Sequence, residues 1–94
     1  MILGTLKVRL QIPGSSSLKE KRKVVKSIKD RLLSLNASVA EVDDLNLWQA
    51  ATIGIAVVSN EAAHANEMLD KALNIITMNM NAEILNSEME IIHL

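Results

Sequence analysis

Basic side chains recur at helical spacing in the first third of the chain, and their chemistry suits a polyanion. On a helical wheel of about 100° per residue, four of them share one outward arc and a fifth lies just beyond it. These residues are Lys19, Arg22, Lys26 and Lys29, with Lys23 beside them. Clustered ammonium and guanidinium groups can contact a phosphate backbone, where counterion release drives binding. The alternative is a solvated helix face, which is the usual role of a charge run.

The distribution of charge along the chain adds support for an anionic partner. The net charge is only −1, but it hides two opposite halves. The segment that ends at Arg31 has nine basic and two acidic residues, or +7, whereas the remainder has one basic and nine acidic residues, or −8. A face that only solvates a helix usually mixes both signs. We therefore predict an RNA partner for the basic stripe, contacted electrostatically.

Lys21 differs from the stripe, because the same wheel places it at the centre of the apolar arc. Its ammonium can reach past the end of the sheet or pair with a carboxylate of a nearby turn, such as Asp43. We expect this structural pairing, with direct ligand contact as the alternative.

Lys7 and Arg9 lie on the polar side of an expected first strand. Glu88 and Glu90 should lie opposite them on the last strand, where cross-strand ion pairs would neutralise all four residues.

Other chemistry has less support in the residues. The Gly14–Ser17 turn leads into a helix start, where free N–H groups attract anions. Phosphate-ester chemistry at Gly14–Arg22 is therefore a further hypothesis. No histidine is expected near these serines, and no catalytic acid–base pair is visible. Asp43, Asp44 and Asn46 are typical of Asx-turns more than of a cation site. We predict no catalytic residue, metal or cofactor.

The elements that position these residues follow from hydrophobic periodicity. Alternation predicts strands, and apolar residues at intervals of three and four predict helices. A serine and a glutamate at the spacing of a capping box, Ser17 and Glu20, predict a helix that begins at Leu18. The expected order is a strand at 2–12, a helix at 18–35, strands at 38–42 and 50–59, a helix capped by Asn60 and a strand at 82–94.

This order predicts one α+β domain over residues 1–94, a ferredoxin-like βαββαβ sandwich. Its antiparallel sheet would have strand order 4-1-3-2, with both helices on one face. In that topology Gly14–Arg22 should lie beside Asp43–Gln49. The length of 94 residues and the absence of cysteine exclude a two-domain enzyme, a disulfide scaffold and an iron–sulfur ferredoxin.

The uncovered face of the predicted sheet suggests self-association. Thr52, Ala56 and Val58 of the third strand are small or apolar there, and no aromatic ring is present to stack bases. Trp48, the sole aromatic residue, should plug the hairpin edge of the core or else anchor a partner. These four residues are the interface candidates for a homo-oligomer.

The chain shows no sign of a membrane or secretory segment. Its longest apolar stretch, Ile53–Val58, is far shorter than the roughly 20 residues of a membrane-spanning helix. The first residues have no basic stretch ahead of an apolar one. We expect a cytoplasmic protein with no membrane partner.

Three motifs resemble the YlxP-like family, domain of unknown function family 503. They are Ser17-Leu18-Lys19-Glu20-Lys21-Arg22, Val39-Ala40-Glu41-Val42-Asp43 and Leu47-Trp48-Gln49. The resemblance spans nearly the whole chain and implies a ferredoxin-like fold in a small bacterial cytosolic protein. Family members are commonly encoded among genes for translation initiation and ribosome maturation, which implies a ribosome-linked role. The family supplies no established catalytic residues.

The residues and the resemblance together predict a noncatalytic protein that associates with RNA or the ribosome through its basic helix. The alternative is a homo-oligomeric interaction or adaptor module that works through its open sheet face.

Overall fold

The computed structural model describes all 94 residues, and each predicted element is present. The elements in chain order are β1 Ile2–Gln11, α1 Leu18–Leu32, β2 Ser38–Asp43, β3 Ala50–Ser59, α2 Ala62–Thr77 and β4 Glu83–His93. A short 3₁₀ helix, η1 Leu33–Leu35, follows α1 and ends at Asn36 in the left-handed conformation, with φ of 53°.

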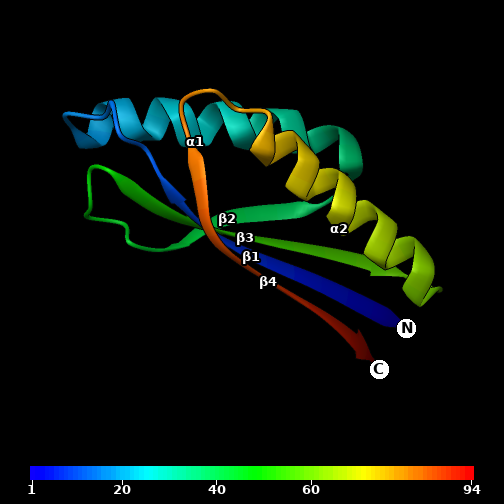
Figure 1. Ribbon diagram of the computed structural model, residues 1–94. Helices are drawn as coiled ribbons and strands as arrows, with labels where there is room; N and C mark the ends of the chain where they lie inside the picture. The colour runs from blue at the N-terminus through cyan, green and yellow to red at the C-terminus, as the bar shows by residue number, and fades with distance from the viewer.

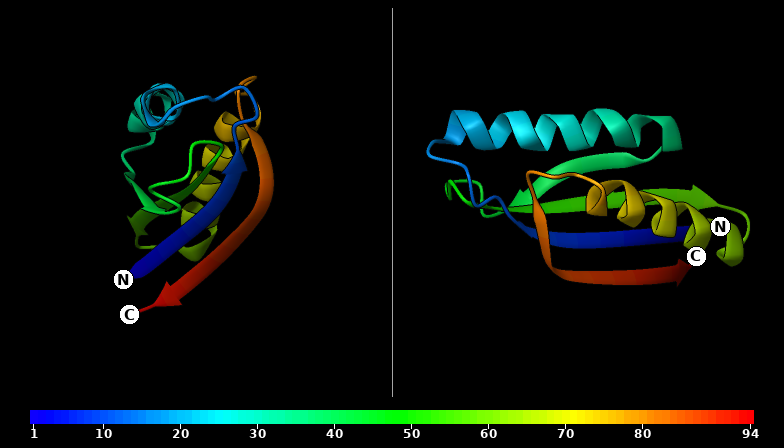
Figure 2. Two further views of the ribbon diagram at one scale, coloured as in Figure 1. Left: turned by 90° about the vertical axis from the view of Figure 1, so that its left-hand side faces the viewer. Right: turned by 45° about the horizontal axis from the view of Figure 1, so that its top comes forward.

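The four strands form one antiparallel sheet in the order β2-β3-β1-β4, with both helices on the same face (Figures 1 and 2). This is the predicted order counted from the other edge, so the ferredoxin-like βαββαβ architecture is confirmed. The left panel of Figure 2 shows that no element covers the second face.

The core lies between the sheet and the helices. Alternate residues of the two central strands face it, which explains the period of two in β1 and β3. The helices contribute apolar side chains at intervals of three and four. The core consists of Ile2, Leu6, Val8, Leu10, Ile12, Val25, Ile28, Leu32, Ala51, Ile53, Ile55, Val57, Ala65, Leu69, Ala72 and Ile76.

The start of α1 confirms half of the predicted capping box. Ser17 is the N-cap, and its Oγ accepts a hydrogen bond from the backbone N of Glu20 at 3.1 Å. In a complete capping box the Glu20 side chain would accept from the backbone N of Ser17. Here its carboxylate accepts instead from the backbone N of Ser16 at 2.6 Å and from the Ser16 hydroxyl at 3.0 Å. These hydrogen bonds stabilise the charged form and lower the pKa of Glu20.

The predicted cap of α2 is wrong. Glu61 occupies the N-cap position with no side-chain cap, and the Ser59 hydroxyl accepts from the Glu61 N–H at 3.1 Å. Asn60 is exposed one residue earlier. At the other end, α2 stops at Thr77, so Met80 lies outside the helix and is 98% exposed.

The two ends of the chain meet at the far end of the sheet from the β2–β3 loop (Figure 1). The backbone N of Leu94 donates to the carbonyl of Met1 at 2.8 Å, and the Met1 amino group donates to the carbonyl of Leu94 at 3.0 Å. Neither helix combines the length and the apolar character that crossing a membrane demands.

Candidate nucleic-acid interface

The predicted basic stripe lies on the outer surface of α1. All five side chains are exposed, namely those of Lys19, Arg22, Lys23, Lys26 and Lys29. Only one of them forms an ion pair within 4 Å, because Lys26 contacts Asp30 at 2.7 Å one helical turn away. Both partners of this pair are mostly exposed, at 75% and 55%, so water screens their attraction. The other four cations, Lys19, Arg22, Lys23 and Lys29, form no ion pair within the protein.

Three residues of the stripe also line one surface hollow beside the edge strand β2. Arg22, Lys26 and Lys29 line a space of about 370 Å³ together with Val25, Asp30 and Glu41. Their spacing of four and three residues puts all three side chains on one side of the helix. The hollow is large enough for phosphate groups, and its cations come from a rigid helix.

Lys21 is buried on the side of α1 that faces the sheet, with a side chain that is only 1% exposed. Its ammonium donates to the Glu41 carboxylate at 2.9 Å and to the carbonyls of Asp44 at 2.9 Å, Leu45 at 3.2 Å and Ala50 at 3.3 Å. One cation from the helix thus holds both ends of the β2–β3 loop against α1.

The partner predicted for Lys21 is wrong, since Glu41 and not Asp43 binds its ammonium. Glu41 pairs in register with the core residue Ile53 and therefore faces the helices. A bulge between Glu41 and Asp43 puts Asp43 opposite Thr52, which turns it toward the uncovered face. The Asp43 carboxylate instead accepts from the backbone N of Asp44 at 2.8 Å. Strand alternation alone could not reveal this bulge.

Asp44 holds the same loop from the uncovered side of the sheet. It has a φ of 60°, a left-handed conformation that aspartate tolerates better than most residues. Its carboxylate accepts from the Thr52 hydroxyl at 2.7 Å and from Nε of Arg9 at 3.1 Å. The Thr52 hydrogen bond first, and the Arg9 contact second, lower the pKa of Asp44. Lys21 and Asp44 therefore anchor the loop from the two faces of the sheet.

These contacts correct the predicted cross-strand ion pairs. In the register of β1 and β4, Arg9 lies opposite Asn86, Lys7 opposite Glu88 and Thr5 opposite Glu90. Arg9 therefore pairs with Asp44 and not with Glu90. Lys7 faces Glu88 across the strands, but no ion pair within 4 Å forms between them.

Two interface predictions are also corrected. Trp48 does not plug the core, because it is 55% exposed, whereas Ile12 and Lys21 are buried. Thr52 is only 3% exposed, since the Asp44 carboxylate covers it. Ala56 and Val58 lie on the uncovered face as predicted, and Val58 is 63% exposed.

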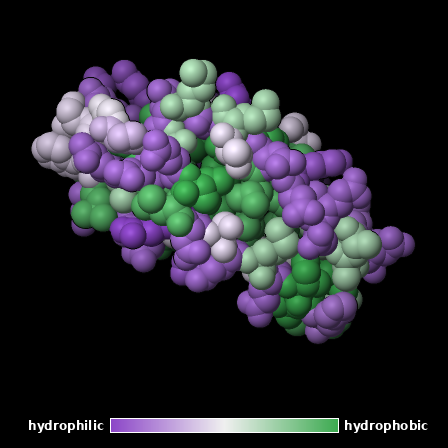
Figure 3. All heavy atoms as spheres, viewed as in Figure 1, coloured by the Kyte–Doolittle hydropathy of each residue, from purple (hydrophilic) through white to green (hydrophobic).

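The loop between β2 and β3 carries a group of exposed apolar side chains. Leu45 and Leu47 are about half exposed, at 56% and 47%. Figure 3 shows an apolar group over this loop at the left end of the molecule, and a larger apolar area below α1. Exposed apolar groups of this kind are common at sites that contact another molecule.

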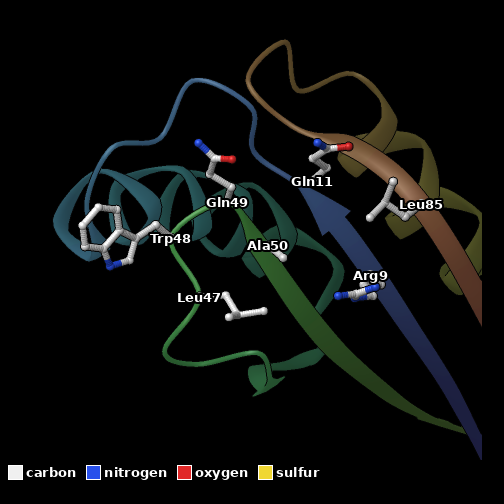
Figure 4. Close-up of a pocket in the computed structure, with 7 residues that line it drawn as sticks. All are labelled: Arg9, Gln11, Leu47, Trp48, Gln49, Ala50 and Leu85. Carbon is white, nitrogen blue, oxygen red and sulfur yellow. The ribbon is translucent and has the colours of Figure 1, made fainter.

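A hollow of about 520 Å³ lies beside this loop, across the ends of β3, β1 and β4. Its lining residues are Arg9, Gln11, Leu47, Trp48, Gln49, Ala50 and Leu85. Figure 4 shows Trp48 projecting outward from the loop, with Leu47 between Trp48 and Arg9 and with Leu85 on the far side of β1. Sequence patterns do not predict this hollow, because Leu85 belongs to a weakly patterned strand whose register shifts near Leu10.

The predicted meeting of Gly14–Arg22 with Asp43–Gln49 is confirmed. Besides the Lys21 contacts, Gln49 donates from Nε2 to the Ser15 carbonyl at 3.1 Å, and its own carbonyl accepts from the backbone N of Ile12 at 2.8 Å. The right panel of Figure 2 shows the loop below the first turn of α1. At that turn, the Glu20 carboxylate occupies the Ser16 N–H group that an external anion would use. The structure holds no group of three or more His, Asp or Glu side chains that could bind a metal ion.

The fold and these surfaces define a small ferredoxin-like α+β domain. The chain belongs to the family described as protein of unknown function (DUF503), whose model matches residues 3–89. This membership confirms the resemblance inferred from the three sequence motifs. No curated protein sequence matches the chain.

Similar solved structures share the fold at low sequence identity. The de novo designed protein LFR1 1, which has a ferredoxin fold, superposes with a TM-score of 0.59 at 15% identity, over 96% of this chain and 86% of that one. A dimeric ferredoxin-like protein from an uncultured marine organism superposes with a TM-score of 0.51 at 8% identity, over 100% and 98% of the two chains. At such identities the likeness concerns the fold alone.

Proposed function

We propose that the chain is a small noncatalytic bacterial protein of the cytoplasm that binds structured RNA, with the ribosome as its setting. The single observation that carries the proposal is the hollow lined by Arg22, Lys26 and Lys29. Cations of a rigid helix bind phosphates with little loss of backbone entropy, since the helix is already ordered.

The remaining charges fit the same role. Lys19 extends the stripe toward the start of α1, Lys23 lies beside it, and neither forms an ion pair within the protein. The stripe contains no planar aromatic group to recognise bases. Binding through α1 is therefore electrostatic and tolerant of sequence.

A charge-reversal experiment tests this proposal. The double variant Arg22→Glu/Lys29→Glu changes two unpaired cations of the hollow. The control Arg31→Glu/Lys71→Glu makes the same change in net charge outside the stripe. Binding of a labelled RNA stem–loop is measured by fluorescence anisotropy at low salt, with circular dichroism as a check of folding. We expect the first variant to lose about tenfold or more in affinity and the control to lose much less.

Equal losses in the two double variants would show that only net charge matters, and unchanged binding in both would refute a role for α1. A parallel salt series with purified ribosomal subunits and bulk RNA tests the ribosomal setting. A preference for subunits that persists as salt rises supports specific docking.

A second candidate function is a homo-oligomeric interaction or adaptor module. It is favoured by the apolar side chains on the uncovered face, where Val42 and Val58 are 52% and 63% exposed. Val42 also covers Gly54, where an added Cβ would lie 2.9 Å from its Cγ1. Beside them, a hollow of about 390 Å³ extends over Thr5, Ala40 and Ala56.

Sedimentation velocity of the wild type and of Val58→Lys tests the second candidate. An oligomer that dissociates in the variant supports it, because a buried ammonium without a partner is costly. A strict monomer at micromolar concentrations excludes it.

A further inference from the structure

Building on the proposed RNA binding, we propose that Trp48 stacks on an unpaired base of the same RNA whose backbone lies on α1. The ligand class is thus a single-stranded segment, such as a loop or a single-stranded overhang, next to a phosphate backbone. An unpaired base offers a flat apolar surface, and an exposed indole ring is the side chain that best complements it.

Trp48 is both exposed and held in place. It is 55% exposed and projects outward from the β2–β3 loop (Figure 4). Its neighbour Gln49 is bonded to Ser15 and Ile12, and Lys21 binds the carbonyl of Ala50 on the β3 side of the loop. A ring on a loop with so many anchors loses little backbone entropy when it stacks.

The anchors also place Trp48 beside the basic helix. Lys21 belongs to the first turns of α1, so its bonds to Asp44, Leu45 and Ala50 bring the loop to the end of the helix that carries Lys19. An RNA strand that follows the stripe toward the start of α1 therefore reaches the β2–β3 loop where the helix begins.

Polar groups in the adjoining hollow complement a nucleotide. Arg9 donates to Asp44 through Nε, which orients the guanidinium and leaves its terminal nitrogens without a protein partner. The Gln11 carboxamide makes no hydrogen bond to the protein, and it offers both a donor and an acceptor. Guanidinium and carboxamide groups beside an aromatic ring suit a base edge and its phosphate. An apolar protein segment would leave these groups unpaired, so RNA is the better match.

The composition makes the test direct, because Trp48 is the only aromatic residue and all tryptophan fluorescence comes from it. A single-stranded oligouridylate and a blunt RNA duplex are titrated into the wild type at low salt. We expect the single strand to quench the emission strongly and the duplex to change it little. Anisotropy of the labelled RNAs gives both affinities independently.

Variants at the loop separate stacking from general contact. Trp48→Ala should lower affinity for the single strand about tenfold, and Trp48→Phe should restore most of it. Duplex affinity should stay unchanged in both. Leu45→Ala is the matched control, since Leu45 is an apolar residue of the same loop with 56% exposure. It should leave both affinities unchanged.

The outcomes distinguish this inference from the proposed function. If RNA binds but the Trp48 emission does not change, and if Trp48→Ala binds RNA with wild-type affinity, the stacking is overturned. The role of α1 stays intact in that case. No binding of either RNA overturns the proposed function and the stacking with it. A blue shift of the emission with rising protein concentration in the absence of RNA assigns Trp48 to self-association and also overturns the stacking.

Discussion

The two sides of α1 carry the same kind of side chain in opposite environments. On the inner side, the Lys21 ammonium is removed from water and bonded to four oxygens, one in β2, two in the β2–β3 loop and one at the start of β3. On the outer side, Lys19, Arg22 and Lys29 are exposed without any ion pair. The hydrogen bonds of the inner cation are all made within the protein, whereas the outer cations are available to a partner.

A basic residue in a sequence motif can therefore be either buried in the fold or exposed to a partner, and the motif alone does not show which. Lys21 and Arg22 are neighbours in the sequence, yet one is 1% exposed and the other is exposed. Helical geometry turns adjacent residues by about 100°, enough to place one in the core and the next in water.

The largest effect should come from the inner side. Lys21→Met keeps the apolar stem but removes the ammonium, which leaves Glu41 and three backbone carbonyls without their donor. We expect a loss of about 3 kcal/mol in the free energy of unfolding, because the Glu41 carboxylate, whose side chain is only 16% exposed, loses its counter-charge. Urea unfolding measures this loss. A loss below about 1 kcal/mol would mean that water replaces the ammonium readily.

A smaller effect is expected at Asp44, the anchor on the opposite face. Its lowered pKa means that the folded state favours the carboxylate, so this stabilisation is present above the ordinary aspartate pKa. It is lost as the pH falls through the lower folded-state value. We expect Asp44→Asn to cost about 1 kcal/mol at pH 7 and to flatten the loss of stability below about pH 4.

Urea unfolding of the wild type and Asp44→Asn between neutral and acidic pH measures this difference. Glu20 is present in both proteins, so its own lowered pKa contributes equally to the two curves. Parallel curves would contradict a stabilising role for the Asp44 charge.

Single outer cations should affect RNA binding modestly and stability hardly at all. Lys29→Gln should weaken RNA binding about threefold and make the slope of log affinity against log salt shallower by about 0.7 for a single strand or 0.9 for a duplex. The salt series used for the wild type measures both quantities. An unchanged slope would show that Lys29 contacts no phosphate.

The smallest effect is expected at Lys26, the matched control for Lys21 on the same helix. Lys26→Met removes an exposed ion pair with Asp30, and such pairs contribute little. The free energy of unfolding should change by less than about 0.5 kcal/mol. A loss near that of Lys21→Met would erase the distinction between the two sides of the helix.

Most of the fold could be predicted from local patterns. Alternation in β1 and β3, together with the Ser17 cap, predicts the elements, and their order leaves few topologies. The meeting of the helix start with the β2–β3 loop follows from that topology. The ionic partners could not be predicted from these patterns. A bulge in β2 turns the Asp43 side chain to the uncovered face of the sheet, and Asp44, in a left-handed conformation, accepts a hydrogen bond from Thr52.

The sequence by itself determined the α+β architecture, the inward position of Lys21 and the outward basic stripe, since helical and strand periods are properties of neighbouring residues. Only the tertiary structure decided that Glu41 receives Lys21, that Arg9 binds Asp44 and that Trp48 stands in solvent. Those outcomes depend on strand register, on one bulge and on the path of a loop, which are settled when distant segments pack together.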